Sequence, residues 1–188
     1  MDSFQWITVT VSIVLGLGIT GTLSGMVALF RARGTVRFDW IPVTWAGCIF
    51  LWQLQYWWAV IELSGLVHTW TILEFAVLLL LVVLLYVASA LVLPAQPTDR
   101  DGDMAASFEH DGRWALIFIS AYFAVALFAN CYLWKSRAFT YAQVLDAALI
   151  ALPLLYLRTK PRRGRVFVTL LYVAVSLVAA WLNSPKAY

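Results

Sequence analysis

Six long apolar blocks constrain the fold of this chain more than any other feature. Each holds about twenty residues, enough at about 1.5 Å of rise per residue to cross a hydrocarbon core about 30 Å thick. No stretch outside them is long enough to form a separate domain, so we expect residues 1–188 to form one all-α, polytopic membrane domain, a compact six-helix bundle. The predicted helices cover about 4–30, 40–63, 70–93, 114–134, 138–157 and 166–182, and the predicted cytoplasmic loops about 31–39, 94–113 and 158–165.

Composition excludes a soluble globular protein. Hydrophobic residues make up 63% of the chain and charged residues 12%, whereas a soluble domain is about half apolar and a quarter charged. Most of the ten tryptophans stand at the ends of the blocks, where indole rings prefer the membrane interface. The first block has no Lys or Arg before it and is too long for a signal-peptide core, so we expect a retained helix.

Lys and Arg are distributed unequally between the two sides of the predicted bundle. The connections on one side hold ten of these residues and those on the other hold three. The positive-inside rule places the larger set in the cytoplasm, and both termini then lie on the non-cytoplasmic side. We therefore expect an integral protein of a bacterial inner membrane, with basic residues that meet lipid and not nucleic acid. The larger set is Arg31, Arg33, Arg37, Arg100, Arg113, Arg158, Lys160, Arg162, Arg163 and Arg165, and the smaller set is Lys135, Arg137 and Lys186.

Small residues repeat along the first predicted helix. Gly21 and Gly25 form a GxxxG pair, and Gly16 stands four residues after Ser12. Such a face lets another helix backbone approach closely. It serves packing inside the bundle, or an interface with a second copy or another membrane subunit, or a flexible point in a moving helix.

Two glutamines lie near the middle of the second predicted helix. Gln53 and Gln55 fall on different faces and need hydrogen-bond partners, because lipid offers none. They either bond across helices and fix the packing, or line a polar cavity.

Asp146 is the main candidate for a proton or cation site. It lies about 12 Å below the outer edge of the fifth predicted helix, where a carboxylate is costly unless it is paired, hydrated or protonated. Gln143 shares its face, and Pro153 is expected to kink the helix further on. The plainer alternative is a structural hydrogen bond between Asp146 and a neighbour such as Asn130.

Glu62, His68 and Glu74 surround the second outer connection and would form an outer vestibule with Asp146. Their equal spacing suggests a metal site, but each has a plainer account. Thr71 and Glu74 match the S/T-x-x-E capping box, Glu62 is near water, and His68 is in the loop. We therefore expect no metal.

Two cytoplasmic connections carry dense charge. The acidic run after Asp99 lacks the EF-hand Gly and Glu positions, so we expect a solvated loop, with Asp111 capping the next helix. The last connection attracts anionic lipid headgroups. The residues expected to contact headgroups are Arg158, Lys160, Arg162, Arg163 and Arg165.

These patterns favour a small channel or transporter for a proton, an ion or a small solute, with Asp146 as the titrating or coordinating group. An accessory or scaffold subunit of a larger membrane complex is the alternative. The chain lacks Ser/His/Asp, HExxH and paired-Asp motifs, so we expect neither an enzyme nor a cofactor. Cys48 and Cys131 belong to no CxxC pair and are expected to act as small apolar residues.

Overall fold

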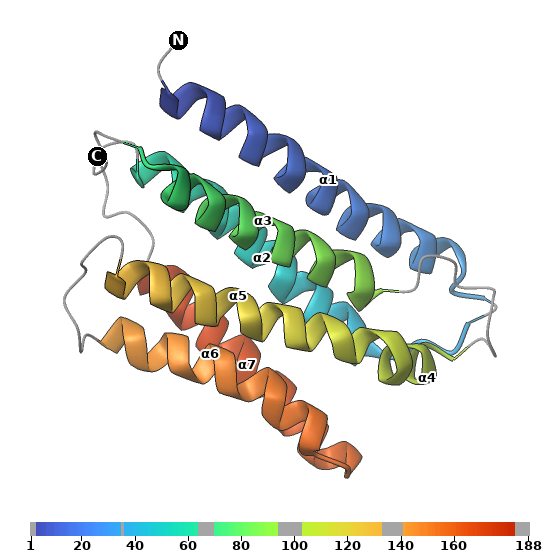
Figure 1. Ribbon diagram of the computed structural model, residues 1–188. Coiled ribbons are helices and arrows are strands. Elements are labelled where there is room, and N and C mark those ends of the chain that lie inside the picture. The colour runs from blue at the N-terminus through green and yellow to red at the C-terminus, as the bar shows by residue number, and fades with distance from the viewer. Residues whose placement is uncertain (1–2, 35, 64–69, 94–102, 133–140, 183–188) are drawn as a thin grey trace.

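The computed structural model describes residues 3–34, 36–63, 70–93, 103–132 and 141–182. This part of the chain is all-α, with six long helices and one short helical segment that leads into the fourth of them (Figure 1). The elements are α1 (Ser3–Arg31), α2 (Trp40–Leu63), α3 (Ile72–Val92), α4 (Met104–Ser107), the π-helical turn η1 (Phe108–Gly112), α5 (Arg113–Tyr132), α6 (Tyr141–Arg158) and α7 (Arg162–Leu182).

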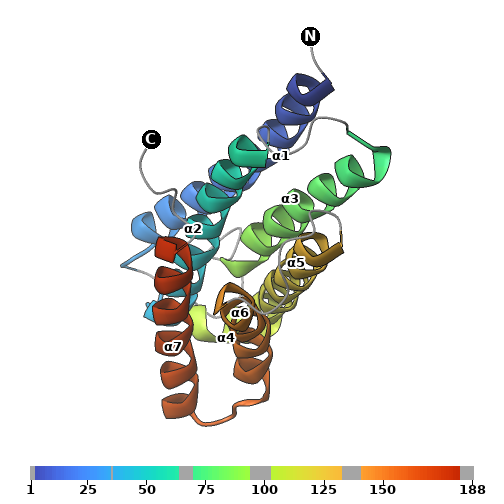
Figure 2. The same cartoon turned by 90° about the vertical axis from the view of Figure 1, so that its left-hand side faces the viewer.

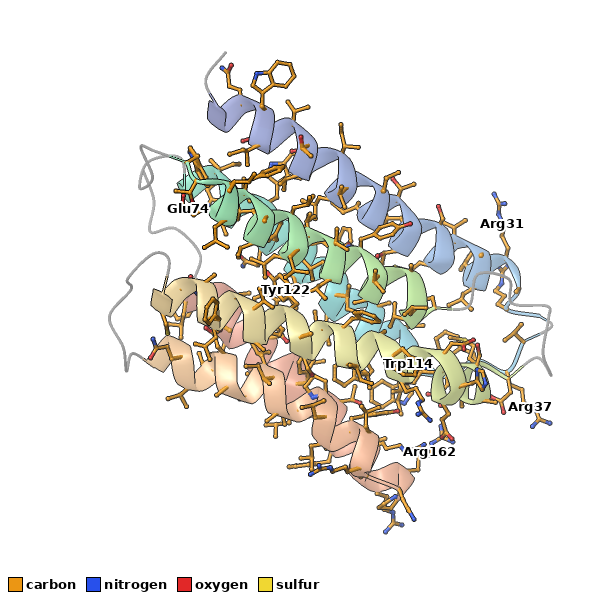
Figure 3. All side chains as sticks on the ribbon, in the orientation of Figure 1. Arg31, Arg37, Glu74, Trp114, Tyr122 and Arg162 are labelled. Atoms are coloured by element: carbon orange, nitrogen blue, oxygen red, sulfur yellow. The ribbon has the colours of Figure 1, made fainter. Side chains whose placement is uncertain are left out.

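The six long helices pack side by side in a ring. Its order is α1, α3, α5, α6, α7 and α2, with α2 closing on α1 and also packing against α3. Two views show that α1 begins and α7 ends at the same end of the bundle (Figures 1 and 2). Arg31, Arg37 and Arg162 lie at the opposite end, whereas Glu74 lies at the end where α1 begins (Figure 3). Three of the basic residues predicted to share one side therefore lie at one end of the bundle.

Among the described residues, four helices are long and apolar enough to cross a membrane: Gln5–Arg31, Ile72–Val92, Met104–Cys131 and Arg162–Leu182. The two remaining long helices carry polar side chains: α2 has two glutamines, and α6 has Asp146 and Gln143. Large apolar side chains also cover the outside of the bundle, as lipid requires and water does not favour. The chain is therefore an integral membrane protein. Exposed examples are Ile13, Leu17, Val144, Phe167, Leu177 and Trp181.

The predicted start of α3 is confirmed in detail. The hydroxyl of Thr71 accepts a hydrogen bond from the Glu74 backbone N–H at 3.3 Å, and the Glu74 carboxylate accepts one from the Thr71 backbone N–H at 2.8 Å. This is the reciprocal capping box, which satisfies two N–H groups that the helix itself cannot pair.

The structure differs from the prediction at the second half of loop 94–113. Helix begins at Met104, with Asp103 as its N-cap, ten residues before the predicted start. Asp111 therefore does not cap the helix, and it lies inside η1 beside His110. Met104 and Phe108, four residues apart, are both buried, so one face of this segment is apolar and held against the end of the bundle.

Aromatic rings fill much of the bundle interior. Trp45 of α2 stacks on Tyr172 of α7 at 4.3 Å between ring centroids and meets the edge of Tyr156 of α6 at 5.7 Å. Trp52, two turns along α2, meets Phe123 of α5 edge-on at 4.7 Å. These rings join four helices around one interior, and the polar atoms they carry define the sites described next.

Candidate functional site

Two interhelical hydrogen bonds fix the register of α2 against α7. The Trp45 indole N–H donates to the Thr169 hydroxyl at 3.2 Å, and the Gln55 side-chain amide donates to the Ala180 carbonyl at 3.0 Å. Both residue numbers rise together, so the two helices run parallel. Gln55 thus bonds across helices, which is one of its two predicted roles.

Between these two bonds lies a group of buried polar side chains, which we name the α2–α7 polar cluster. It consists of Cys48 and Trp52, one turn apart on α2, and Tyr172 and Ser176, one turn apart on α7. Trp52 and Ser176 are the polar neighbours of the Tyr172 hydroxyl, and Ser176 is also close to the Cys48 thiol. Within the described residues, none of Trp52 Nε1, Tyr172 OH and Ser176 Oγ reaches good hydrogen-bond geometry.

Ser176 differs from other hydroxyl residues inside these helices. Thr22, Ser120 and Thr169 each donate to the carbonyl four residues earlier, at 2.8–3.1 Å. This local bond is the usual way for a helical hydroxyl to find a partner in an apolar setting. The Ser176 hydroxyl lies instead beside the other members of the cluster.

Asp146 is partly buried on α6 and close enough to Tyr122 of α5 to act electrostatically on its hydroxyl. No hydrogen bond joins Asp146 to Asn130 in the part of the chain that the structure describes. Gln143 instead approaches the Cys131 sulfur, with its Nε2 at 3.6 Å. α5 and α6 therefore bring Gln143 and Cys131 into contact, and the electrostatic influence of Asp146 on Tyr122 was not predicted from the sequence.

Gln53 lies where α1, α2 and α3 meet. Its side chain is 0% exposed, and neither end of its amide has a hydrogen-bond partner among the described residues. A Cβ added at Gly18 would lie 2.7 Å from Gln53 Nε2, so the absence of a side chain at Gly18 makes room for the amide. The Ser89 hydroxyl donates to the Gly18 carbonyl at 3.3 Å on the same junction.

The glycines of α1 divide between two faces. Gly25 packs against Leu93 at the end of α3, where an added Cβ would lie 3.2 Å from Leu93 Cδ1. Gly16 and Gly21 face open space, with no atom within 4 Å of an added Cβ. Only part of the predicted small-residue face therefore packs inside the bundle. The two glycines in close contact with other helices are Gly18 and Gly25, and Gly21 is not one of them.

The predicted outer vestibule lies mostly outside the described residues. His68 and the side chain of Glu62 are not among them, and Glu74 is engaged in the capping box. In the described part of the chain, no group of three His, Cys, Asp or Glu side chains is placed to hold a metal ion.

The basic residues around the start of α7 fall into two groups. Arg165 pairs with Glu109 of η1, and Arg162 with Asp39 at 3.4 Å. The other three, which are exposed and free to meet headgroups, are Arg158, Lys160 and Arg163.

Comparison with protein-family models, with curated proteins and with solved structures finds no match for this chain. The geometry of the bundle interior is therefore the basis for the function proposed below.

Proposed function

We propose that the chain crosses a bacterial inner membrane six times, with both termini on the non-cytoplasmic side. The ring arrangement supports this, because α2 and α6 lie between helices that are apolar enough to span. The concentration of basic side chains at one end supports the orientation.

Inside this bundle we propose a small channel or transporter that moves a proton, an ion or a small solute. One observation carries the proposal: fully buried polar atoms of Trp52, Gln53, Tyr172 and Ser176 lack well-formed hydrogen bonds within the described residues. Polar groups at this depth are costly without partners. A chain that needed only to pack could place apolar side chains here, so a polar interior suits a passing solute.

Asp146 is the proposed protonatable or coordinating group. It stands on α6 beside the buried Tyr122, which continues the polar interior of the α2–α7 polar cluster toward the outer end. The proposed neutral lining comes from Gln53, with Gln143 and Asn130 near the outer ends of α6 and α5 and Gln55 beside α7. An ionisable group inside a membrane bundle generally marks such a path.

The test is flux in liposomes that contain the purified protein, under proton and ion gradients. Asp146→Asn should keep the fold, because an amide resembles a carboxylic acid in shape, and should abolish proton-linked flux, because it cannot titrate. Asp111→Asn, the same change at an exposed position, should leave flux unchanged. Wild-type flux in folded Asp146→Asn protein would remove Asp146 from the mechanism.

An accessory subunit of a larger membrane complex is the second candidate. The observation that favours it is the open face of α1 at Gly16 and Gly21, which another helix backbone could approach closely. Gly21→Leu should then release a co-purifying chain in mild detergent without unfolding the protein. A wild-type protein that shows no flux under any gradient but keeps such a partner would favour this function over transport.

A further inference from the structure

The segment formed by α4 and η1, residues 104–112, continues α5 in line at its N-terminal end and lies at the basic end of the helix ring (Figure 1). It contacts α2 through α4, and α3 and α5 through η1. The Met104 backbone N–H donates to the Arg37 carbonyl at 3.3 Å, which ties the segment to the connection between α1 and α2. The first turns of this continuous helix thus lie at the basic end of the bundle, in contact with α2 and α3.

An aromatic column connects this segment to the α2–α7 polar cluster. Phe108 of η1 is 3% exposed and meets the edge of Tyr156 at 5.9 Å between ring centroids. Tyr156 meets Trp45, and Trp45 stacks on Tyr172 of the cluster. Three ring contacts therefore separate the cluster from the end of the bundle, and Phe108 is the outermost ring.

The residue that follows Phe108 forms an ion pair that is accessible to water. Glu109, the next residue, pairs with Arg165 of α7, and the two side chains are 55% and 26% exposed. The Arg165 guanidinium also lies 5.8 Å from the centroid of the Tyr156 ring. Ion pairs at such exposure contribute little to stability, so this contact can open without unfolding the bundle.

The local backbone is also unusual. η1 is a π-helical turn, a form that is rare and frequent at functional sites. Gly112 at its end has no side chain, and an added Cβ would overlap the Phe108 ring. The ring therefore lies back over Gly112, in a position that depends on this one glycine.

We propose that residues 104–112 form a gate at the basic end of the bundle, with Phe108 as its plug and the Glu109–Arg165 ion pair as its latch. This inference rests on the proposed transport function, because it assigns a closure to the route through the α2–α7 polar cluster. Opening moves Phe108 away from Tyr156 and exposes the column to water.

Cys48 offers a native reporter for this gate. It belongs to the cluster, is 7% exposed, and lies one turn beyond Trp45 on α2. With Cys131 replaced by Ser, the rate at which a water-soluble maleimide modifies Cys48 measures access to the interior. Glu109→Gln should raise this rate several-fold, and Phe108→Ala should raise it further. Asp111→Asn removes an exposed carboxylate two residues away, whose ion pair is with His110, and should leave the rate unchanged.

Two further measurements complete the test. Higher salt should raise the labelling rate of the wild type, because salt screens exposed ion pairs, and should have no effect on Glu109→Gln. The exchanged pair, Glu109→Arg with Arg165→Glu, should restore slow labelling. Unchanged labelling in Glu109→Gln, or in a Phe108→Ala protein that keeps its melting temperature, overturns the gate. Maleimide labelling of Cys48 does not depend on transport. An absence of flux would therefore refute the proposed function, and the labelling rates would still test the gate.

Discussion

Replacing Gly112 with Ala is the sharpest test of the packing at the basic end of the bundle. The added methyl carbon would lie 2.7 Å from Phe108 Cε2 and 2.8 Å from Cγ, and closer still to Cδ2. These atoms belong to a rigid ring that is almost fully buried against Tyr156. The ring must leave its site or the helix must shift, so we expect Gly112→Ala to destabilise the protein.

The magnitude follows from two opposing effects. Overpacking a filled site costs about 1–3 kcal/mol, and complete loss of a buried Phe side chain costs about 3–5 kcal/mol. Ala gains up to about 1 kcal/mol over Gly from helix propensity. The net loss of unfolding free energy should therefore be about 1–3 kcal/mol. Gly47→Ala is the matched control, because an added Cβ there meets no atom within 4 Å.

The assay is reversible unfolding in mild detergent, applied to Gly112→Ala, Phe108→Ala and the double variant. If the Phe108 ring is the cause, Gly112→Ala becomes neutral or stabilising once the ring is absent. An equal loss of stability in both backgrounds would refute the reasoning, because the cost would then arise from the π-helical backbone itself.

Three other positions give simpler predictions. Gly18→Ala should lower the melting temperature by displacing Gln53, whereas Gly21→Ala should not, because it faces open space; equal effects would contradict this packing. Thr71→Ala should cost about 0.5–2 kcal/mol of unfolding free energy through loss of the α3 cap, and no change in a denaturation curve would show that the cap is dispensable. A topology reporter fused after Tyr188 should be active outside the cytoplasm, and a purely cytoplasmic signal would reject six spans.

Long apolar blocks predicted the main helices well. The second predicted helix, 40–63, coincides with α2 (Trp40–Leu63), and the third with α3 to within two residues. Both helices are bounded by residues that clearly end the apolar run, such as the N-cap residue Thr71. The segment 104–112 was missed because its charged residues resemble a solvated loop. Its two apolar anchors, Met104 and Phe108, give no periodicity over so short a stretch, and contacts with other helices decide the outcome.

The candidate polar residues could be chosen from the sequence, but their partners could not. Gln53 and Gln55 have the same chemistry and nearly the same depth, yet only Gln55 reaches a carbonyl on α7. Tyr172 and Ser176 lie in a helix that reads as an ordinary apolar span. The four-residue spacing of Tyr172 and Ser176 was only a weak sign of a shared polar face on α7. The residues of α2 that lie opposite them can be identified only once the register of the two helices is known.

The polar residues of α2 and α6 affect how these two helices pack in the ring. α2 and α6 carry the glutamines and Asp146, so each is costly against lipid on every side. α2 is packed against α1, α3 and α7, and α6 against α5 and α7. Both helices nevertheless present large apolar side chains outward, α2 through Leu54 and Trp57 and α6 through Val144 and Leu155. The polar residues of α2 and α6 therefore lie on helices that face lipid on one side and the bundle on the other, and they are the first residues to test for the proposed path of a solute.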